Sequence, residues 1–332
     1  MRKRLTLQDY AAGIRSGNRV ILSQAITLVE STLDTDRELA SQLIQEVLPL
    51  TGNSLRIGIT GVPGVGKSTF IEAFGKMLLG LGKKVAVLAV DPSSQLSRGS
   101  ILGDKTRMEL LAVDKRAFIR PSPSGHTLGG VSARTREAML LCEAVGFDVI
   151  LVETVGVGQS ETAVKNMVDF FLLLMLAGAG DELQGIKKGI MEMADALVIH
   201  KADGNNLDLA KKAKANYQNA LHLFPQSEKN WYPKVLLASS LTGMGLEKVW
   251  DLILDYEQKM KDSTFWEANR ASQRVNWLDD QIQDLLGQAF LRNEKVKSVL
   301  ELEKTKVRSG ELHPGVLAQR LIGLFLSKSN KV

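Results

Sequence analysis

Residues 61–68 carry the pattern with the clearest chemistry in the chain. They read Gly-Val-Pro-Gly-Val-Gly-Lys-Ser, which matches the phosphate-binding pattern G-x-x-x-x-G-K-[ST]. Glycines let successive backbone amides turn toward phosphate oxygens, and the N-terminus of a following helix adds partial positive charge. An ordinary glycine turn is the alternative, but a strand-like run (LRIGIT) precedes this one and a helical run (STFIEAFGKMLLG) follows it. The pattern therefore predicts a nucleotide-binding loop made of Gly61, Val62, Pro63, Gly64, Val65, Gly66, Lys67, Ser68 and Thr69.

Three side chains of this loop have predicted roles. We expect Lys67 to neutralise the β- and γ-phosphates, Ser68 to place its hydroxyl on Mg²⁺, and Thr69 to help hold the α-phosphate. A carboxylate near the metal is then needed at the end of a neighbouring strand, and FDVILVE ends in Glu153. Common GTPases carry Asp-x-x-Gly here, and the matching Gly156 would bind the γ-phosphate through its N–H. The alternative for Glu153 is a solvated side chain at a strand end.

Two aspartates are further candidates for the metal site. Asp91 follows the strand-like run KVAVLAV, whose end faces the phosphates in a doubly wound sheet. Asp104 lies in the glycine-rich stretch SRGSILGDKTRM, which is typical either of a loop ordered by the γ-phosphate or of a plain surface loop.

Residues 200–203 resemble the guanine-reading loop Asn-Lys-x-Asp, with His200 in the place of the asparagine. The carboxylate of Asp203 suits the guanine N1–H and amino group, whereas adenine presents a lone pair at N1. The stem of Lys201 suits the base plane. An imidazole can supply one of the asparagine's two jobs, contact with the base or attachment to the phosphate loop, but not both. The later run LASSLTGMG predicts backbone donors to guanine O6 from Ala238, Ser239 and Ser240.

The elements that must position these residues show an α/β pattern. Six short apolar runs between residues 55 and 240 lack polar alternation, as strands buried on both faces do. They predict a P-loop NTPase fold with a mostly parallel, doubly wound sheet. Helical periodicity at both ends predicts an N-terminal helical extension (1–53), a G domain (54–258) and a C-terminal helical arm (259–332). Within that arm, 265–292 reads as one long helix with an apolar stripe, suited either to the G domain or to a second subunit.

Composition narrows the class of protein. The net charge of +5 is mild and without long basic blocks, so we expect no nucleic-acid partner. One cysteine permits no internal disulfide, and no apolar run approaches the length of a membrane span. We expect a soluble, cytoplasmic protein without membrane attachment.

Several longer segments together resemble one family. They are DPSS (91–94), GSILGDKTRM (99–108), ETVGVGQSE (153–161) and AGAGDELQGIKKGIME (177–192). With the phosphate-binding loop, they resemble the MeaB/ArgK group of P-loop GTPases, chaperones of adenosylcobalamin-dependent methylmalonyl-CoA mutase.

This resemblance implies a Mg²⁺-dependent, partner-stimulated GTP hydrolase that forms a homodimer through its C-terminal helices. It implies that Lys67, Ser68, Asp91, Asp104 and Glu153 surround the phosphates and metal. It also implies that 178–188 is a switch segment that links nucleotide state to the mutase, with Gln184 and Lys187 as its working residues. The partner implied is methylmalonyl-CoA mutase or a related acyl-CoA mutase.

Two other functions remain as alternatives. Metal-insertion GTPases usually carry Cys or His clusters, whereas this chain has one Cys and four scattered His. An ATPase or kinase serving amino-acid transport is an older label for the family, and Asp203 disfavours adenine.

Overall fold

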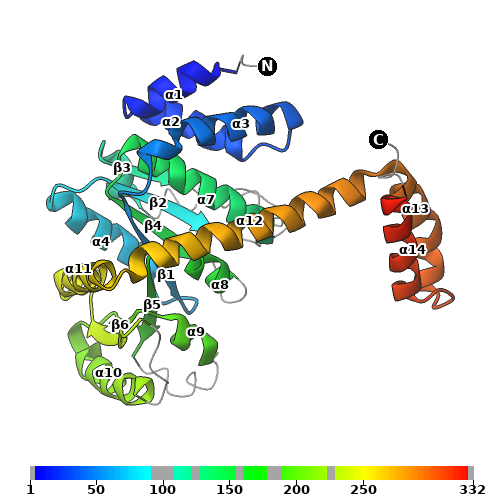
Figure 1. Ribbon diagram of the computed structural model, residues 1–332. Helices are drawn as coiled ribbons and strands as arrows, with labels where there is room; N and C mark the ends of the chain where they lie inside the picture. The colour runs from blue at the N-terminus through cyan, green and yellow to red at the C-terminus, as the bar shows by residue number, and fades with distance from the viewer. Residues whose placement is uncertain are drawn as a thin grey trace. The chain divides into compact units, whose positions relative to one another are not determined.

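The computed structural model describes residues 4–90, 108–120, 128–154, 160–177, 188–222 and 229–327. In this part of the chain a 7-stranded sheet is flanked by helices (Figure 1). The strands are β1 (Leu55–Gly61), β2 (Val85–Val90), β3 (Ala117–Arg120), β4 (Val149–Thr154), β5 (Phe170–Leu176), β6 (Ala196–His200) and β7 (Lys234–Leu237). The helices of the first 200 residues are α1 (Leu7–Arg15), α2 (Arg19–Val29), α3 (Asp34–Val47), α4 (Lys67–Gly80), α6 (Glu109–Val113), α7 (Leu128–Val145), α8 (Ser160–Lys165) and α9 (Lys188–Met193). Those that follow are α10 (Leu207–Leu221), α11 (Leu246–Asp262), α12 (Phe265–Arg292), α13 (Glu294–Arg308) and α14 (Pro314–Leu326).

The strand order is β3-β2-β4-β1-β5-β6-β7, and every neighbouring pair is parallel. Strand β1 lies between β4 and β5, with Ile59 opposite Glu153 and Gly61 opposite Leu174. Because all the strands are parallel, their carboxyl ends lie at one edge of the sheet. The prediction of a parallel, doubly wound sheet is confirmed.

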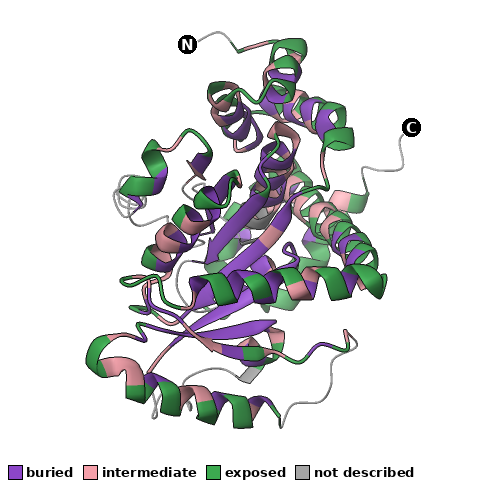
Figure 2. Ribbon diagram, turned by 90° about the vertical axis from the view of Figure 1, so that its left-hand side faces the viewer, coloured by how far each residue is buried: buried purple, intermediate pink, exposed green. Residues whose placement is uncertain are grey.

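Alternate residues of the central strands enter separate hydrophobic clusters on the two faces of the sheet. In β4, Val149 and Leu151 pack with α4 and α11, whereas Ile150 and Val152 pack with α7 and the N-terminal helices. This two-sided burial explains the continuous apolar runs of the sequence. Figure 2 shows the strands buried between helices whose outer surfaces are exposed.

The N-terminal helices cover the face of the sheet on which α7 packs. Helix α1 starts at a capping box, in which the Thr6 hydroxyl accepts from the Asp9 amide and the Asp9 carboxylate accepts from the Thr6 amide. The helix ends at Arg15, and Ser16 caps its C-terminus. Buried residues of α1, α2 and α3 share one cluster with α7, β2 and β4.

Strand β3 was not predicted. Its four residues, Ala117-Phe118-Ile119-Arg120, are too short for a periodic signal, and a proline follows at once. Pairing with β2 along Val85–Leu88 makes them an edge strand.

The chain divides into two compact units, Met1–Gln273 and Arg274–Val332. Helix α12 begins in the first and ends in the second, as one continuous helix, as predicted. Within the second unit, α13 and α14 pack through Val296, Leu317 and Leu321, which are buried. The finer division at 53/54 and 258/259 stays a prediction. Within the described residues, no helix combines the length and apolar character needed to cross a membrane.

Candidate nucleotide-binding site

The predicted phosphate-binding loop joins the end of β1 to the start of α4, at the carboxyl edge of the sheet. Gly66 caps α4 with φ 90°, a left-handed conformation that glycine adopts without strain. Gly61 has φ 155°, and a Cβ there would lie 2.5 Å from the carbonyl oxygen of Leu174. The loop therefore needs glycine at both positions, and the N-terminus of the 14-residue helix α4 follows directly.

Lys67 lies within this loop and donates from Nζ to the carbonyl oxygen of Gly61 at 2.8 Å. Burial lowers the pKa of its ammonium group, and the charges of Glu153 and Glu161 oppose that shift. An ammonium group that has lost part of its hydration gains more from a phosphate than a fully solvated one does. The arrangement suits the predicted role of Lys67 on the β- and γ-phosphates.

Ser68 and Glu153 meet beside the loop. The Ser68 hydroxyl donates to Oε1 of Glu153 at 3.0 Å, and Glu153 is only 5% exposed at the end of β4. A hydroxyl and a carboxylate are hard oxygen ligands of the kind Mg²⁺ accepts, together with waters and substrate phosphates. These two residues therefore fit a Mg²⁺ ion at the position the sequence predicted.

Glu161 is a further acidic residue near this site, and the sequence pattern alone predicts no role for it. It lies near the start of α8 with 0% exposure, and its charge acts on Lys67. A signal was present in the sequence, because Glu161 closes the unusual segment ETVGVGQSE. Together with Glu153, it is a second carboxylate whose charge favours the protonated form of Lys67.

The loop after β6 lies against the phosphate-binding loop. Lys201 has φ 57°, and its Nζ donates to the carbonyl oxygen of Gly64 at 2.9 Å. The buried ring of His200 lies 2.7 Å from the carbonyl oxygen of Val65 through Nδ1, and 2.7 Å from Oγ of Ser240 through Nε2. The asparagine of the usual loop contacts the base and also attaches the loop to the phosphate-binding loop. His200 makes the second of these contacts, through Val65.

Asp203 lies where the sequence predicted a reader of the base. The Ser239 hydroxyl donates to its Oδ2 and so orients the carboxylate. The amides of Ala238 and Ser239 donate to the carbonyl oxygens of Ile199 and Met244, at 3.0 and 2.9 Å. Both amides are thus bonded to backbone carbonyl groups, and the predicted donation of either one to guanine O6 would require that bond to be shared or replaced. The amide of Ser240 remains the predicted donor.

Five of the predicted site residues lie outside the described part of the chain. They are Asp91, Asp104, Gly156, Gln184 and Lys187. Among the residues that are described, no group of three or more His, Cys, Asp or Glu side chains could hold a metal ion.

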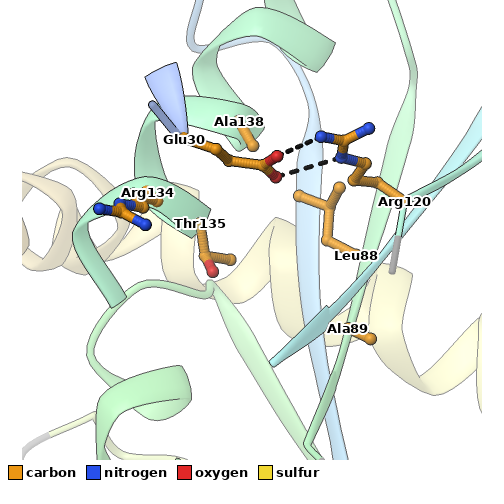
Figure 3. A pocket seen from close by; sticks show the side chains of 7 residues that line it. All are labelled: Glu30, Leu88, Ala89, Arg120, Arg134, Thr135 and Ala138. Carbon is orange, nitrogen blue, oxygen red and sulfur yellow. Dashed lines mark hydrogen bonds and ion pairs between the residues drawn. The ribbon is translucent and has the colours of Figure 1, made fainter. Parts of the chain in front are cut away.

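A small pocket lies near the ends of β2 and β3 (Figure 3). Its lining includes Ala89, Arg134 and the ion pair of Arg120 with Glu30. Figure 3 shows the guanidinium of Arg120 directed at the Glu30 carboxylate. None of the predicted site residues lines this pocket, so it is separate from the phosphate-binding loop.

The chain is similar to a family model and to several known proteins. A family model described as "Methylmalonyl Co-A mutase-associated GTPase MeaB" matches residues 22–295. The chain is 48% identical over 309 residues to "GTPase ArgK" of Escherichia coli, covering 93% of each protein. It is 47% identical over 326 residues to "Methylmalonic aciduria type A homolog, mitochondrial" of Mus musculus, covering 95% of this chain and 79% of that one.

A solved structure is similar over the whole chain. It is titled "Crystal structure of LAO/AO transport system kinase", with a TM-score of 0.75 and 40% identity, and the match covers 98% of this chain and 99% of that one.

Proposed function

The chain belongs to the MeaB family of methylmalonyl-CoA mutase-associated GTPases, and we propose that it is a Mg²⁺-dependent GTPase chaperone of an adenosylcobalamin-dependent acyl-CoA mutase. The client proposed first is methylmalonyl-CoA mutase, with a related acyl-CoA mutase as the second choice. The chaperone would gate cofactor loading and protect the mutase in a manner controlled by its nucleotide state. The family description and the mouse relative's printed name, which concerns methylmalonic aciduria, support this client.

One observation carries the GTPase part of the proposal. The phosphate-binding loop is fastened to the base-reading loop, because Lys201 bonds to Gly64 and His200 bonds to Val65. Asp203 follows in the same loop, held by Ser239. The groups that we propose for the triphosphate, the metal and the guanine base come from loops at the carboxyl edge of the sheet, which supports the proposal.

The residues divide the work of GTP hydrolysis among them. Lys67 would leave the Gly61 carbonyl and bind oxygens of the β- and γ-phosphates, stabilising the charge that grows on the leaving group. Ser68 and Glu153 would hold Mg²⁺, Glu153 directly or through a water. An ion held by these two residues would supply positive charge that offsets the negative charge of the triphosphate. Water attacks the γ-phosphorus, the bond to the β–γ bridging oxygen breaks, and GDP and phosphate leave.

Five predicted roles outside the described residues remain part of the proposal. Asp91 and Asp104 would complete the metal surroundings, and Gly156 would bind the γ-phosphate. Gln184 and Lys187 would act in the segment that couples nucleotide state to the mutase.

We also propose a homodimer formed through the C-terminal helices. Large apolar side chains on the second half of α12 are exposed, among them Leu278 at 59%, Ile282 at 45% and Leu285 at 57%. Their spacing of four and three residues places them on one helix face. A row of this kind is suited to a second copy of the same helix.

The test is steady-state hydrolysis of GTP and ATP by the purified protein, with and without a methylmalonyl-CoA mutase from the same organism. We expect slow GTP turnover alone, faster turnover with the mutase, and no comparable ATP turnover. GTP turnover that ignores the mutase would remove the proposed client and leave the GTPase assignment intact. A preference for ATP would contradict the guanine assignment. It would favour the alternative function, an ATPase or kinase.

A further inference from the structure

His200 joins two loops that are far apart in the sequence. Its ring is 2% exposed at the end of β6, between the phosphate-binding loop and the loop after β7. The oxygen near Nδ1 is the backbone carbonyl of Val65, which can only accept, so Nδ1 carries the proton and donates. In the neutral ring Nε2 has a lone pair and accepts from the Ser240 hydroxyl. Both ring nitrogens are therefore bonded within the protein.

Packing fixes the ring in this position. Phe70 meets it edge-on with 5.7 Å between ring centroids. A Cβ added to Gly66 would lie 3.1 Å from the ring, so the ring leaves little room for a side chain at this position of the phosphate loop. Burial lowers the pKa of His200, which favours the neutral form. A protonated ring would still use both nitrogens, since Nε2–H would donate to the same Ser240 oxygen.

Lys201 strengthens the same attachment. It donates to Gly64 while His200 donates to Val65, so neighbouring side chains bind neighbouring carbonyl groups of the phosphate loop. Lys201 itself has a left-handed backbone conformation. Both ring nitrogens of His200 are therefore used to connect the phosphate-binding loop with the loop after β7.

A guanine base presents two acceptors, O6 and N7, on the edge beside its N1–H. Asp203 suits the N1–H and the amino group, and the Ser240 amide suits O6. An asparagine at position 200 has two N–H groups, so it can bond to the phosphate loop with one and to N7 with the other. The imidazole has one N–H, which Val65 takes.

We propose that His200 is a positioning residue that fastens the phosphate loop to the loop after β7, and that this protein therefore binds guanine with no hydrogen bond to N7. The inference rests on the guanine-nucleotide binding assigned above. Guanine selectivity then depends on Asp203 and the Ser240 amide, with no contribution from position 200.

The probe is 7-deaza-GDP, in which a C–H group replaces N7 and the other hydrogen-bonding groups remain. Dissociation constants of GDP and 7-deaza-GDP would be measured by calorimetry for the natural protein and for His200→Asn. We expect the natural protein to bind both within about twofold. The variant should bind 7-deaza-GDP about threefold to tenfold more weakly than GDP, which corresponds to one hydrogen bond.

The comparison decides the matter in either direction. A natural protein that binds 7-deaza-GDP at least about threefold more weakly than GDP overturns the inference, and this measurement needs no variant. Equal ratios in the two proteins also overturn it, because position 200 would then not control the contact with N7. ADP is the separate control for the site itself: if ADP binds as tightly as GDP, the guanine assignment fails as well.

Discussion

The hydroxyl of Ser68 donates to Oε1 of Glu153 at 3.0 Å, joining the first turn of α4 to the end of β4. The two residues are 85 positions apart in the sequence. Common GTPases have aspartate in the place of Glu153, and the longer side chain still reaches the serine. This pair is the predicted core of the metal site.

The first prediction concerns this pair. Replacing Glu153 with Ala should reduce Mg²⁺ affinity or GTP turnover by about 10- to 100-fold, the usual effect of losing a residue that supports a metal. Hydrolysis measured across a Mg²⁺ titration checks this, with Glu153→Asp expected to retain most activity. Glu38→Ala, at an exposed glutamate, is the control. An unchanged Mg²⁺ requirement in Glu153→Ala would remove Glu153 from the metal site.

Asp203→Asn should change which base is bound. The amide no longer accepts from both guanine N–H groups, so GDP affinity should fall by about 5- to 150-fold, and affinity for xanthosine diphosphate should rise. Competition with a fluorescent nucleotide measures both, and Asp208→Asn on the exposed side of α10 is the matched control. Unchanged GDP affinity in Asp203→Asn would contradict the assignment.

Buried His200 predicts a pH dependence of stability. Its folded-state pKa lies below the ordinary value of 6.5, mainly through burial, with Lys201 also lowering it and Val65 and Asp203 opposing. Below pH 6.5 the unfolded chain takes up a proton that the folded chain does not. Its stabilising contribution is therefore complete above pH 6.5 and is lost as pH falls toward the lowered pKa.

The variant His200→Gln lacks this titration. The free energy of unfolding of the natural protein minus that of the variant should decrease from pH 7 to pH 5, as measured by urea denaturation at several pH values. A difference that stays constant over this range would show that burial of the imidazole does not favour its neutral form.

Arg270 should contribute strongly to stability. It is 5% exposed and holds the start of α12 on the sheet, bonding to both carboxylate oxygens of Asp169 and to the carbonyl oxygens of Gly52 and Ser54. Arg270→Ala leaves the buried Asp169 without this partner, at a cost of about 3–5 kcal/mol. Urea denaturation checks this.

The matched control for Arg270 is Lys211→Ala. Its exposed ion pair with Asp208 should contribute no more than about 1 kcal/mol. Equal effects of the two substitutions would mean that the buried pair adds nothing beyond a surface pair.

The apolar face of α12 predicts the oligomeric state. A double substitution of Leu278 and Leu285 by Glu places charge on the proposed dimer contact, and the protein should become monomeric by light scattering coupled to gel filtration. Leu209→Glu, at a similarly exposed leucine of α10, should leave the oligomeric state unchanged. A double variant with the same mass in solution as the natural protein would place the contact elsewhere.

Much of the fold follows from local sequence. Apolar runs without alternation mark strands covered on both faces, and this pattern correctly indicated β1, β2, β4, β5, β6 and β7. Thr6 and Asp9 mark the start of α1 because their capping bonds span three residues. The phosphate-binding loop was predictable because its glycines and Lys67 lie within a few residues of one another in the sequence.

Tertiary structure decided what depends on distant partners. His200 and Val65 are 135 positions apart in the sequence. The residues next to His200 therefore do not show whether its single N–H bonds to the phosphate-binding loop or to the base. The use of the Ala238 amide by Ile199 depends on strand register, and the four residues of β3 become a strand only by pairing with β2. Short-range patterns determine the elements and the chemical groups, whereas packing determines which groups are already bonded and which remain for the ligand.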